Sequence, residues 1–145
     1  MGTWMDGAFI SGVLVSIVTI SIQAMATLVV IKAVRYAARH LSGRRKVETL
    51  VLVMAASGTL LTVAHLVEVM VWALLYSATG ATEPDNVYYF AFVNFTTLGY
   101  GDLIPARPWR ILGPMTAANG MLLFGWSTAV LFAVLSRSIA YLRLR

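Results

Sequence analysis

The 145-residue sequence contains no cysteine and few charged residues. Without cysteine, the chain can form neither a disulfide framework nor a cysteine metal site. Charged residues make up only 12% of the chain, whereas 59% of it is hydrophobic and its mean hydropathy is +0.80. Because a soluble domain of this length could not bury so much apolar surface, the composition predicts a membrane protein with a single domain.

Acidic residues are scarce as well: the chain has six of them, compared with eleven lysines and arginines. Cytoplasmic segments of membrane proteins are rich in lysine and arginine, so the basic clusters predict an N-terminus outside the cell membrane and a cytoplasmic C-terminus. A basic loop that binds nucleic acid is an alternative, but topology already accounts for the charge, and no nucleic-acid partner is expected. No helix carries an arginine at every third position, so a voltage-sensor helix is absent. The clustered basic residues are Lys32, Arg35, Arg39, Arg44, Arg45, Lys46, Arg137, Arg143 and Arg145.

Three apolar stretches are long enough to cross a membrane: residues 9–31, 49–76 and 111–136. At 1.5 Å per residue, the first would be about 35 Å long, which exceeds the roughly 30 Å hydrocarbon core of a bilayer. A signal peptide is the alternative for this stretch. It lacks a basic start and is longer than a signal core, so we expect a retained helix. We therefore predict three transmembrane helices.

The linker between the last two stretches, residues 77–110, begins and ends on the outer side. Residues 77–86 are polar and rich in turn formers, which indicates an exposed loop. The following aromatic run, VYYFAFVNFTT at residues 87–97, is too short to span and too apolar for water, as is typical of a re-entrant helix. Beyond it, LGYGD cannot continue a helix. Because non-helical backbone at membrane depth must lie within protein or along water, this segment should line an aqueous path.

Two glycines in this segment, Gly99 and Gly101, alternate with ordinary residues. Glycine adopts positive φ without steric cost, so the alternation lets successive carbonyl groups point to the same side. A column of carbonyl oxygens is suited to a dehydrated cation.

The sequence TTLGYGD, residues 96–102, resembles the selectivity filter of potassium channels, T-x-G-Y-G-D. The resemblance extends over residues 86–136 and includes Pro105, Arg110 and an inner helix with two glycines. It implies an all-α membrane protein whose subunit has three transmembrane helices, a re-entrant pore helix and a filter. One chain supplies one pore loop, so the resemblance also implies a homotetramer. The predicted organisation is an extra helix with a basic loop at 1–46 and a pore domain at 47–145, with outer helix 48–76, pore helix 87–97, filter 97–101 and inner helix 110–138.

The resemblance assigns roles to individual residues of the filter. The carbonyl groups of the filter residues and the Thr97 hydroxyl would replace the water shell of K⁺. The Tyr100 ring and the Leu98 side chain would brace the filter from behind. Asp102 would accept a hydrogen bond from Tyr89 of the pore helix. Leucine replaces the commoner valine at Leu98, and Val93 stands where some members carry a carboxylate. The implied ion-binding residues are Thr97, Leu98, Gly99, Tyr100 and Gly101, with Thr96, Asp102 and Tyr89 as support.

The inner helix is interrupted by Gly120 and Gly125. Close packing of helices and a gating hinge are both open readings of Gly120. Asn119 is expected to form a hydrogen bond to a neighbouring helix. By resemblance, four helically spaced residues would line the cavity below the filter: Met121, Phe124, Thr128 and Phe132.

His65 and Glu68 interrupt the second stretch, and with Trp72 they share one helix face. A buried carboxylate in a membrane is costly, so this face should point into protein. Three readings stay open: a mutually satisfied pair, a proton-sensitive brace behind the filter, and a metal site, for which two ligands are too few. Polar residues of the first helix also suggest one protein-facing side: Ser11, Ser16, Thr19, Ser21, Gln23 and Thr27.

Together these observations predict a potassium-selective channel that conducts passively, without catalysis, and whose partners are K⁺, membrane lipid and further copies of the chain. The expected bound ion is K⁺ and no organic cofactor is expected. Modulation by pH through His65 and Glu68 is an added option. The alternatives are a less selective cation channel, a subunit that does not conduct alone, and a membrane enzyme or metal-binding protein that uses the same two residues.

Overall fold

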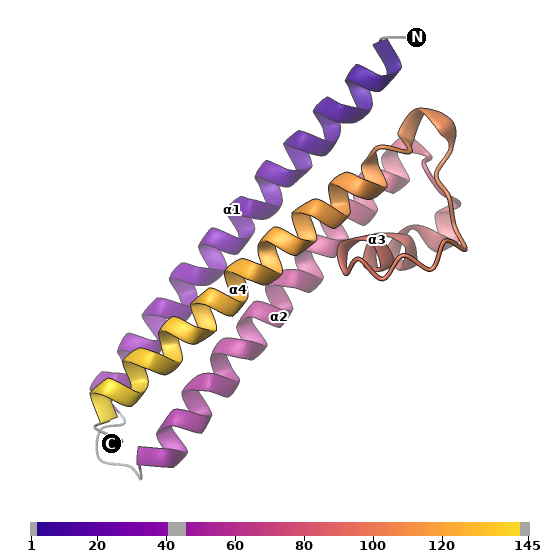
Figure 1. Ribbon diagram of the computed structural model, residues 1–145. Helices are drawn as coiled ribbons and strands as arrows, with labels where there is room; N and C mark the ends of the chain where they lie inside the picture. Colours follow the sequence, from indigo (N-terminus) through magenta and orange to yellow (C-terminus); the bar gives the residue numbers. More distant parts are fainter. Residues whose placement is uncertain (1–2, 41–45, 143–145) are drawn as a thin grey trace.

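The computed structural model describes residues 3–40 and 46–142, and within these ranges every regular element is a helix. Three helices are long and apolar enough to cross a membrane: α1 (Thr3–His40), α2 (Lys46–Thr79) and α4 (Leu112–Leu142). They run side by side as a bundle (Figure 1). The predicted all-α class and the three membrane-length helices are confirmed.

A fourth helix, α3 (Val87–Phe95), is much shorter and lies across the bundle beside α2 and α4 (Figure 1). Short 3₁₀ turns precede α3 and α4, at Pro84–Asn86 (η1) and Arg107–Trp109 (η2). Proline near the start of each turn supplies a fixed φ suited to the beginning of a helix. The non-helical residues 96–106 lead from the end of α3 to the end of the bundle where α4 begins.

The helices differ in length from the predicted stretches. The first continues to His40, nine residues beyond the predicted stretch 9–31, so Arg35 and Arg39 lie on α1 and not in a basic loop that follows this stretch. Alanine-rich sequence without glycine or proline gives the helix no reason to stop earlier. The ring of His40 stacks on that of Tyr36, with centroids 4.2 Å apart. Conversely, α3 ends at Phe95, two residues before the predicted end.

The two ends of the bundle differ in charge. The start of α1, α3 and the 96–106 loop lie toward one end, and the end of α1, the start of α2 and the end of α4 lie at the other (Figure 1). The second end carries Lys32, Arg35, Arg39, Lys46 and Arg137. Four further predicted topology residues, Arg44, Arg45, Arg143 and Arg145, lie outside the described residues. The grouping agrees with the predicted topology, while the side of the membrane stays a prediction.

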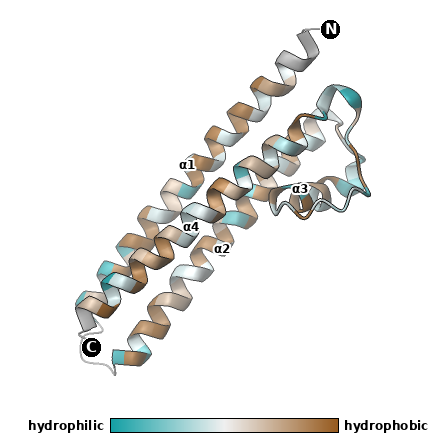
Figure 2. Cartoon of the chain, viewed as in Figure 1, coloured by the Kyte–Doolittle hydropathy of each residue, from teal (hydrophilic) through white to brown (hydrophobic). Residues whose placement is uncertain are grey.

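The outer surfaces of the long helices are apolar (Figure 2), with Phe9, Leu14 and Met25 more than half exposed. Inside the bundle, one apolar cluster surrounds Trp72, Tyr76 and Phe95 near α3, and a second surrounds Val30, Val53, Leu61 and Val134 toward the basic end. Lipid is as apolar as these side chains, so the helices associate through close packing and polar contacts. Such polar contacts lie between the two clusters.

Candidate ion pathway

The short helix α3 is held by aromatic contacts on one side. Phe90, Ala91, Val93 and Phe95 are buried, and the Phe90 ring meets the Tyr76 ring edge-on at a centroid distance of 4.9 Å. These contacts fix the helix against α2 and α4 and hold its carboxyl end near the middle of α4. That end carries the negative pole of the helix dipole, which favours a nearby cation.

The carboxyl end of α3 passes directly into the predicted filter. The Thr97 N–H donates to the Asn94 carbonyl and the Leu98 N–H donates to the Val93 carbonyl, each at 2.9 Å. This pair of bonds is the Schellman pattern of helix termination, in which the residue after the cap has positive φ. Here that residue is Thr97, with φ of 59°. The first residue of the predicted filter is thus also the residue that terminates α3.

A threonine at this position is unusual because glycine normally occupies it. A β-branched side chain in left-handed backbone costs on the order of 1–2 kcal/mol. Among the described residues, Thr97 is the only non-glycine with positive φ, and its side chain is exposed. The unfavourable backbone conformation of Thr97 therefore occurs at the position where the resemblance to potassium-channel filters implies a hydroxyl ligand.

Beyond Thr97, every second residue has positive φ. Gly99 has φ of 59° and Gly101 has φ of 75°, whereas neither Leu98 nor Tyr100 has a positive value. In an ordinary strand successive carbonyl groups point in opposite directions, but alternation of the sign of φ turns them toward the same side. This is the backbone pattern that the two glycines predicted. Whether an ion occupies it stays a prediction.

Asp102 is held by two hydrogen bonds just after the residues with alternating φ. The Tyr89 hydroxyl donates to Oδ2 of Asp102 at 2.6 Å, and the Leu103 N–H donates to Oδ1 at 3.1 Å. The predicted contact between Asp102 and the aromatic ring of α3 is therefore present. Hydrogen bonding to the Asp102 carboxylate is the main cause that raises the pKa of Tyr89. The phenol therefore remains a donor throughout the physiological range.

The side chains of Leu98 and Tyr100 have no cover within the chain. They are 54% and 68% exposed, respectively. Their predicted role is to brace the filter from behind. Within a single chain, neither side chain is packed against a neighbouring element. Both side chains are therefore left largely exposed by the chain itself.

Gly120 is where α4 passes closest to α3. A Cβ atom at this position would overlap the carbonyl group of Phe95, at the end of α3. Gly125, one and a half turns later, has open space around the same position. The structure therefore places Gly120 in close contact with the end of α3, as the packing interpretation expects, and a hinge function at Gly120 stays a prediction.

Four residues predicted to line a cavity form an exposed stripe on α4. Met121 is 66% exposed, Phe132 is 70% exposed, and Phe124 and Thr128 are exposed between them. Phe124 also contacts Phe95, with ring centroids 5.5 Å apart, which connects the stripe to the end of α3. The stripe therefore begins beside the predicted filter and continues toward the basic end of the bundle.

A buried polar layer joins α1, α2 and α4. The Thr19 hydroxyl and the indole N–H of Trp72 both donate to Oδ1 of Asn119, at 2.8 and 2.9 Å. In a second group, Gln23 donates to the Ser127 hydroxyl at 2.6 Å, and that hydroxyl lies 2.9 Å from Nε2 of His65. The prediction that α1 has a protein-facing polar side is confirmed for Thr19 and Gln23, and Asn119 bonds neighbouring helices as expected. Sequence reasoning did not single out Ser127.

His65 and Glu68 belong to this layer. Nδ1 of His65 lies 2.7 Å from Oε2 of Glu68, whose side chain is fully buried, so this face points into protein as predicted. The His65 ring also contacts Phe95 and Phe124. The pair therefore touches the end of α3 through Phe95 and the inner helix through Ser127. No group of three or more histidine, aspartate or glutamate side chains placed to hold a metal ion occurs in the described part of the chain.

Three membrane-length helices, a short helix that ends against the inner helix, and a loop with alternating φ together define a helical membrane protein with a re-entrant loop. Residues 49–137 match the sequence model of a family described as "Ion channel". The match covers more than half of the chain, so the protein belongs to this ion channel family, and α1 lies outside the matched region. Searches of curated proteins and of solved structures gave no match.

Proposed function

We propose that the protein is a potassium-selective channel in which four copies surround one pore. Membership of the ion channel family supports the channel, and the alternating φ at Thr97, Gly99 and Gly101 supports the selectivity. Carbonyl groups that point to one side replace the water shell of a dehydrated cation. In this proposal the ligands are the carbonyl groups of Thr97, Leu98, Gly99 and Tyr100, together with the Thr97 hydroxyl.

The homotetramer follows from what one chain leaves open. A single loop supplies one wall of a filter, and the exposed Leu98 and Tyr100 side chains lack a neighbour within the chain. Four copies related by a rotation axis close the ring and give these side chains a protein environment. The exposed stripe of α4 then faces the axis and lines the cavity below the filter. The extracellular side is the end with the filter, by the distribution of basic residues.

The experiment is ion flux from proteoliposomes that contain the purified chain, with K⁺ or Na⁺ gradients and Ba²⁺ as a blocker. We expect flux with K⁺, little with Na⁺, and block by Ba²⁺. Equal flux of the two ions would replace the proposal with a less selective cation channel. The absence of any flux, with the protein shown to be tetrameric, would support a subunit that does not conduct alone.

Modulation by pH is a second proposal, which rests on the contacts of His65. An imidazole changes charge within the physiological pH range. The groups that face it among the described residues are Glu68 on its own helix, Ser127 and Phe124 on α4, and Phe95 on α3, and only Glu68 of these can titrate. A change of charge at His65 therefore acts on both the end of the pore helix and the inner helix.

A further inference from the structure

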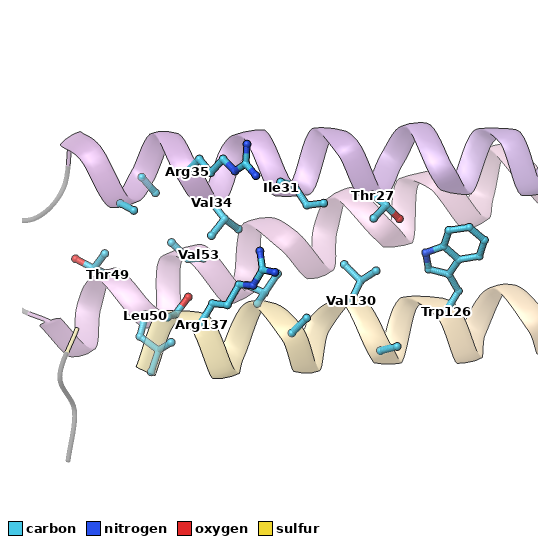
Figure 3. A pocket seen from close by; sticks show the side chains of 16 residues that line it. Thr27, Ile31, Val34, Arg35, Thr49, Leu50, Val53, Trp126, Val130 and Arg137 are labelled. Atoms are coloured by element: carbon cyan, nitrogen blue, oxygen red, sulfur yellow. The ribbon is translucent and has the colours of Figure 1, made fainter. Parts of the chain in front are cut away.

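A cavity of about 660 Å³ opens between α1, α2 and α4 at the basic end of the bundle. It lies outside the polar layer and does not include the filter or the stripe on α4. Small residues on two helices leave this space, among them Ala37 and Ala38 on α1 and Ala129 and Ala133 on α4. Its walls are otherwise mainly aliphatic, as Figure 3 shows for Ile31, Val34 and Val130.

The cavity is elongated along the helices. Trp126 and Thr27 lie at one end, and Arg137, Thr49 and Leu50 lie toward the other (Figure 3). From Trp126 to Arg137, α4 advances eleven residues, or about 16 Å at 1.5 Å per residue. This is about half of the roughly 30 Å hydrocarbon core of a bilayer. The cavity therefore has the depth of a single leaflet.

Two arginines stand at the basic end of the cavity. Arg35 on α1 and Arg137 on α4 both line the cavity. In Figure 3 the Arg137 side chain points from α4 toward the other helices, and the Arg35 side chain lies along α1. Neither guanidinium group has an ion pair or hydrogen bond with another residue in the described ranges. Arginine binds phosphate oxygens in a bidentate manner, and an unpaired arginine at the edge of a bilayer is expected to find an anionic partner.

We propose that this cavity binds one anionic phospholipid of the leaflet at the basic end, which the proposed orientation makes the cytoplasmic leaflet. An acyl chain lies in the apolar cavity and reaches Trp126, and the phosphate group lies between Arg35 and Arg137. The occupant is a lipid because the walls are apolar over the depth of a leaflet. It is anionic because two unpaired guanidinium groups stand where the headgroup would be. The site includes α1, which the ion channel family match does not cover.

The test uses the full chain in phosphatidylcholine vesicles and a phosphatidylglycerol whose acyl chains carry bromine, which quenches nearby tryptophan. Brominated phosphatidylcholine at the same mole fraction is the neutral comparison. The chain has four tryptophans, so the difference between the wild type and Trp126→Phe isolates the signal of Trp126. We expect quenching of Trp126 at low mole fractions of the brominated anionic lipid and at much higher fractions of the neutral one.

Variants at the arginines separate a site from general surface attraction. Each basic residue near an anionic surface strengthens binding about fivefold, so Arg35→Gln with Arg137→Gln should raise the half-quenching fraction roughly 25-fold. Arg39→Gln is the matched control for Arg35→Gln alone, because it removes one charge one turn further along α1, at a residue that does not line the cavity. It should leave the quenching of Trp126 near the wild-type value. Ordinary phosphatidylglycerol should reverse the quenching, and free inorganic phosphate should not.

Equal quenching by the two brominated lipids in the wild type would overturn the proposal, and this comparison needs no variant. An effect of Arg39→Gln as large as that of Arg35→Gln alone would also overturn it, in favour of general attraction to the basic end. Reversal by inorganic phosphate alone would show an anion site without a lipid. The readout does not depend on conduction, so its outcome is separate from that of the proposed channel function.

Discussion

The polar layer of the bundle and the filter loop differ in where their groups find partners. In the polar layer, side chains of α1, α2 and α4 find partners within one chain, as Asn119 does with Thr19 and Trp72. In the filter loop, residues 97–101 are exposed, and the backbone has positive φ at Thr97, Gly99 and Gly101. The polar layer is mostly paired within a single chain, with only Oε1 of Gln23, Oε1 of Glu68 and Nδ2 of Asn119 lacking a partner among the described side chains. The filter loop instead leaves the side chains of Leu98 and Tyr100 exposed, which our proposal explains by other copies of the chain.

The largest effect should come from Gly101→Ala. A side chain at φ of 75° costs on the order of 1–2 kcal/mol and rotates the backbone away from the alternating pattern. We expect K⁺ flux to be abolished while the tetramer still forms, as measured by liposome flux and size-exclusion chromatography. Normal flux in this variant would refute the filter assignment.

Gly120→Ala should be nearly as severe, since a Cβ atom there overlaps the Phe95 carbonyl group at the end of α3. Accommodation requires movement of the end of α3 or of α4, at a cost of roughly 1–3 kcal/mol, and it displaces the start of the filter. We expect a lower thermal unfolding midpoint and reduced flux.

The matched control is Gly125→Ala on the same helix, where the Cβ atom meets open space. Its unfolding midpoint and flux should stay close to the wild type. A change in open probability in Gly120→Ala without any loss of stability would instead favour the hinge.

The polar layer should be tested by Asn119→Leu, which keeps the volume of the side chain and removes two buried hydrogen bonds. The Trp72 indole N–H is left without its acceptor, and the expected loss of stability is about 1–3 kcal/mol. Ser21→Ala is the control, because the Ser21 hydroxyl is exposed and bonds only to its own helix. Equal unfolding midpoints for the two variants in detergent would show that the layer does not hold α1 to the pore domain.

The smallest effect is expected from Glu68→Gln, in which an amide of similar shape faces His65. Basal K⁺ flux should persist at neutral pH, but its dependence on pH between about 5 and 8 should change, because the amide cannot exchange a proton with the imidazole. Flux profiles across this range provide the measurement. If the variant folds and its profile coincides with that of the wild type, Glu68 serves only in packing.

The sequence predicted more of the filter than of the bundle, for a physical reason. Glycine permits positive φ at little steric cost, so the alternate positions of Gly99 and Gly101 indicated where the backbone could adopt it. The spacing of His65 and Glu68 on one helix face likewise predicted their contact and burial. By contrast, no local pattern could indicate that Ser127 would contact Gln23. The two residues are 104 positions apart in sequence, and their contact depends on how α1 and α4 are rotated against each other.

Two other features were missed for similar reasons. The left-handed conformation of Thr97 was hidden because threonine is not a residue that signals the end of a helix, so α3 was predicted to be two residues too long. The cavity between Arg35 and Arg137 was hidden because alanines on separate helices create it, and alanine carries no signal of its own. The sequence placed both arginines in the clusters of basic residues, but their proximity is a property of the packed bundle.

The central claim is that the alternating backbone of residues 97–101 selects K⁺. Its most direct test is the reversal potential of single channels in a planar bilayer, with K⁺ on one side and Na⁺ on the other. The account predicts a reversal potential displaced far toward the equilibrium potential of K⁺, with currents that Ba²⁺ blocks. A reversal potential near zero, with currents carried equally by both ions, would contradict it.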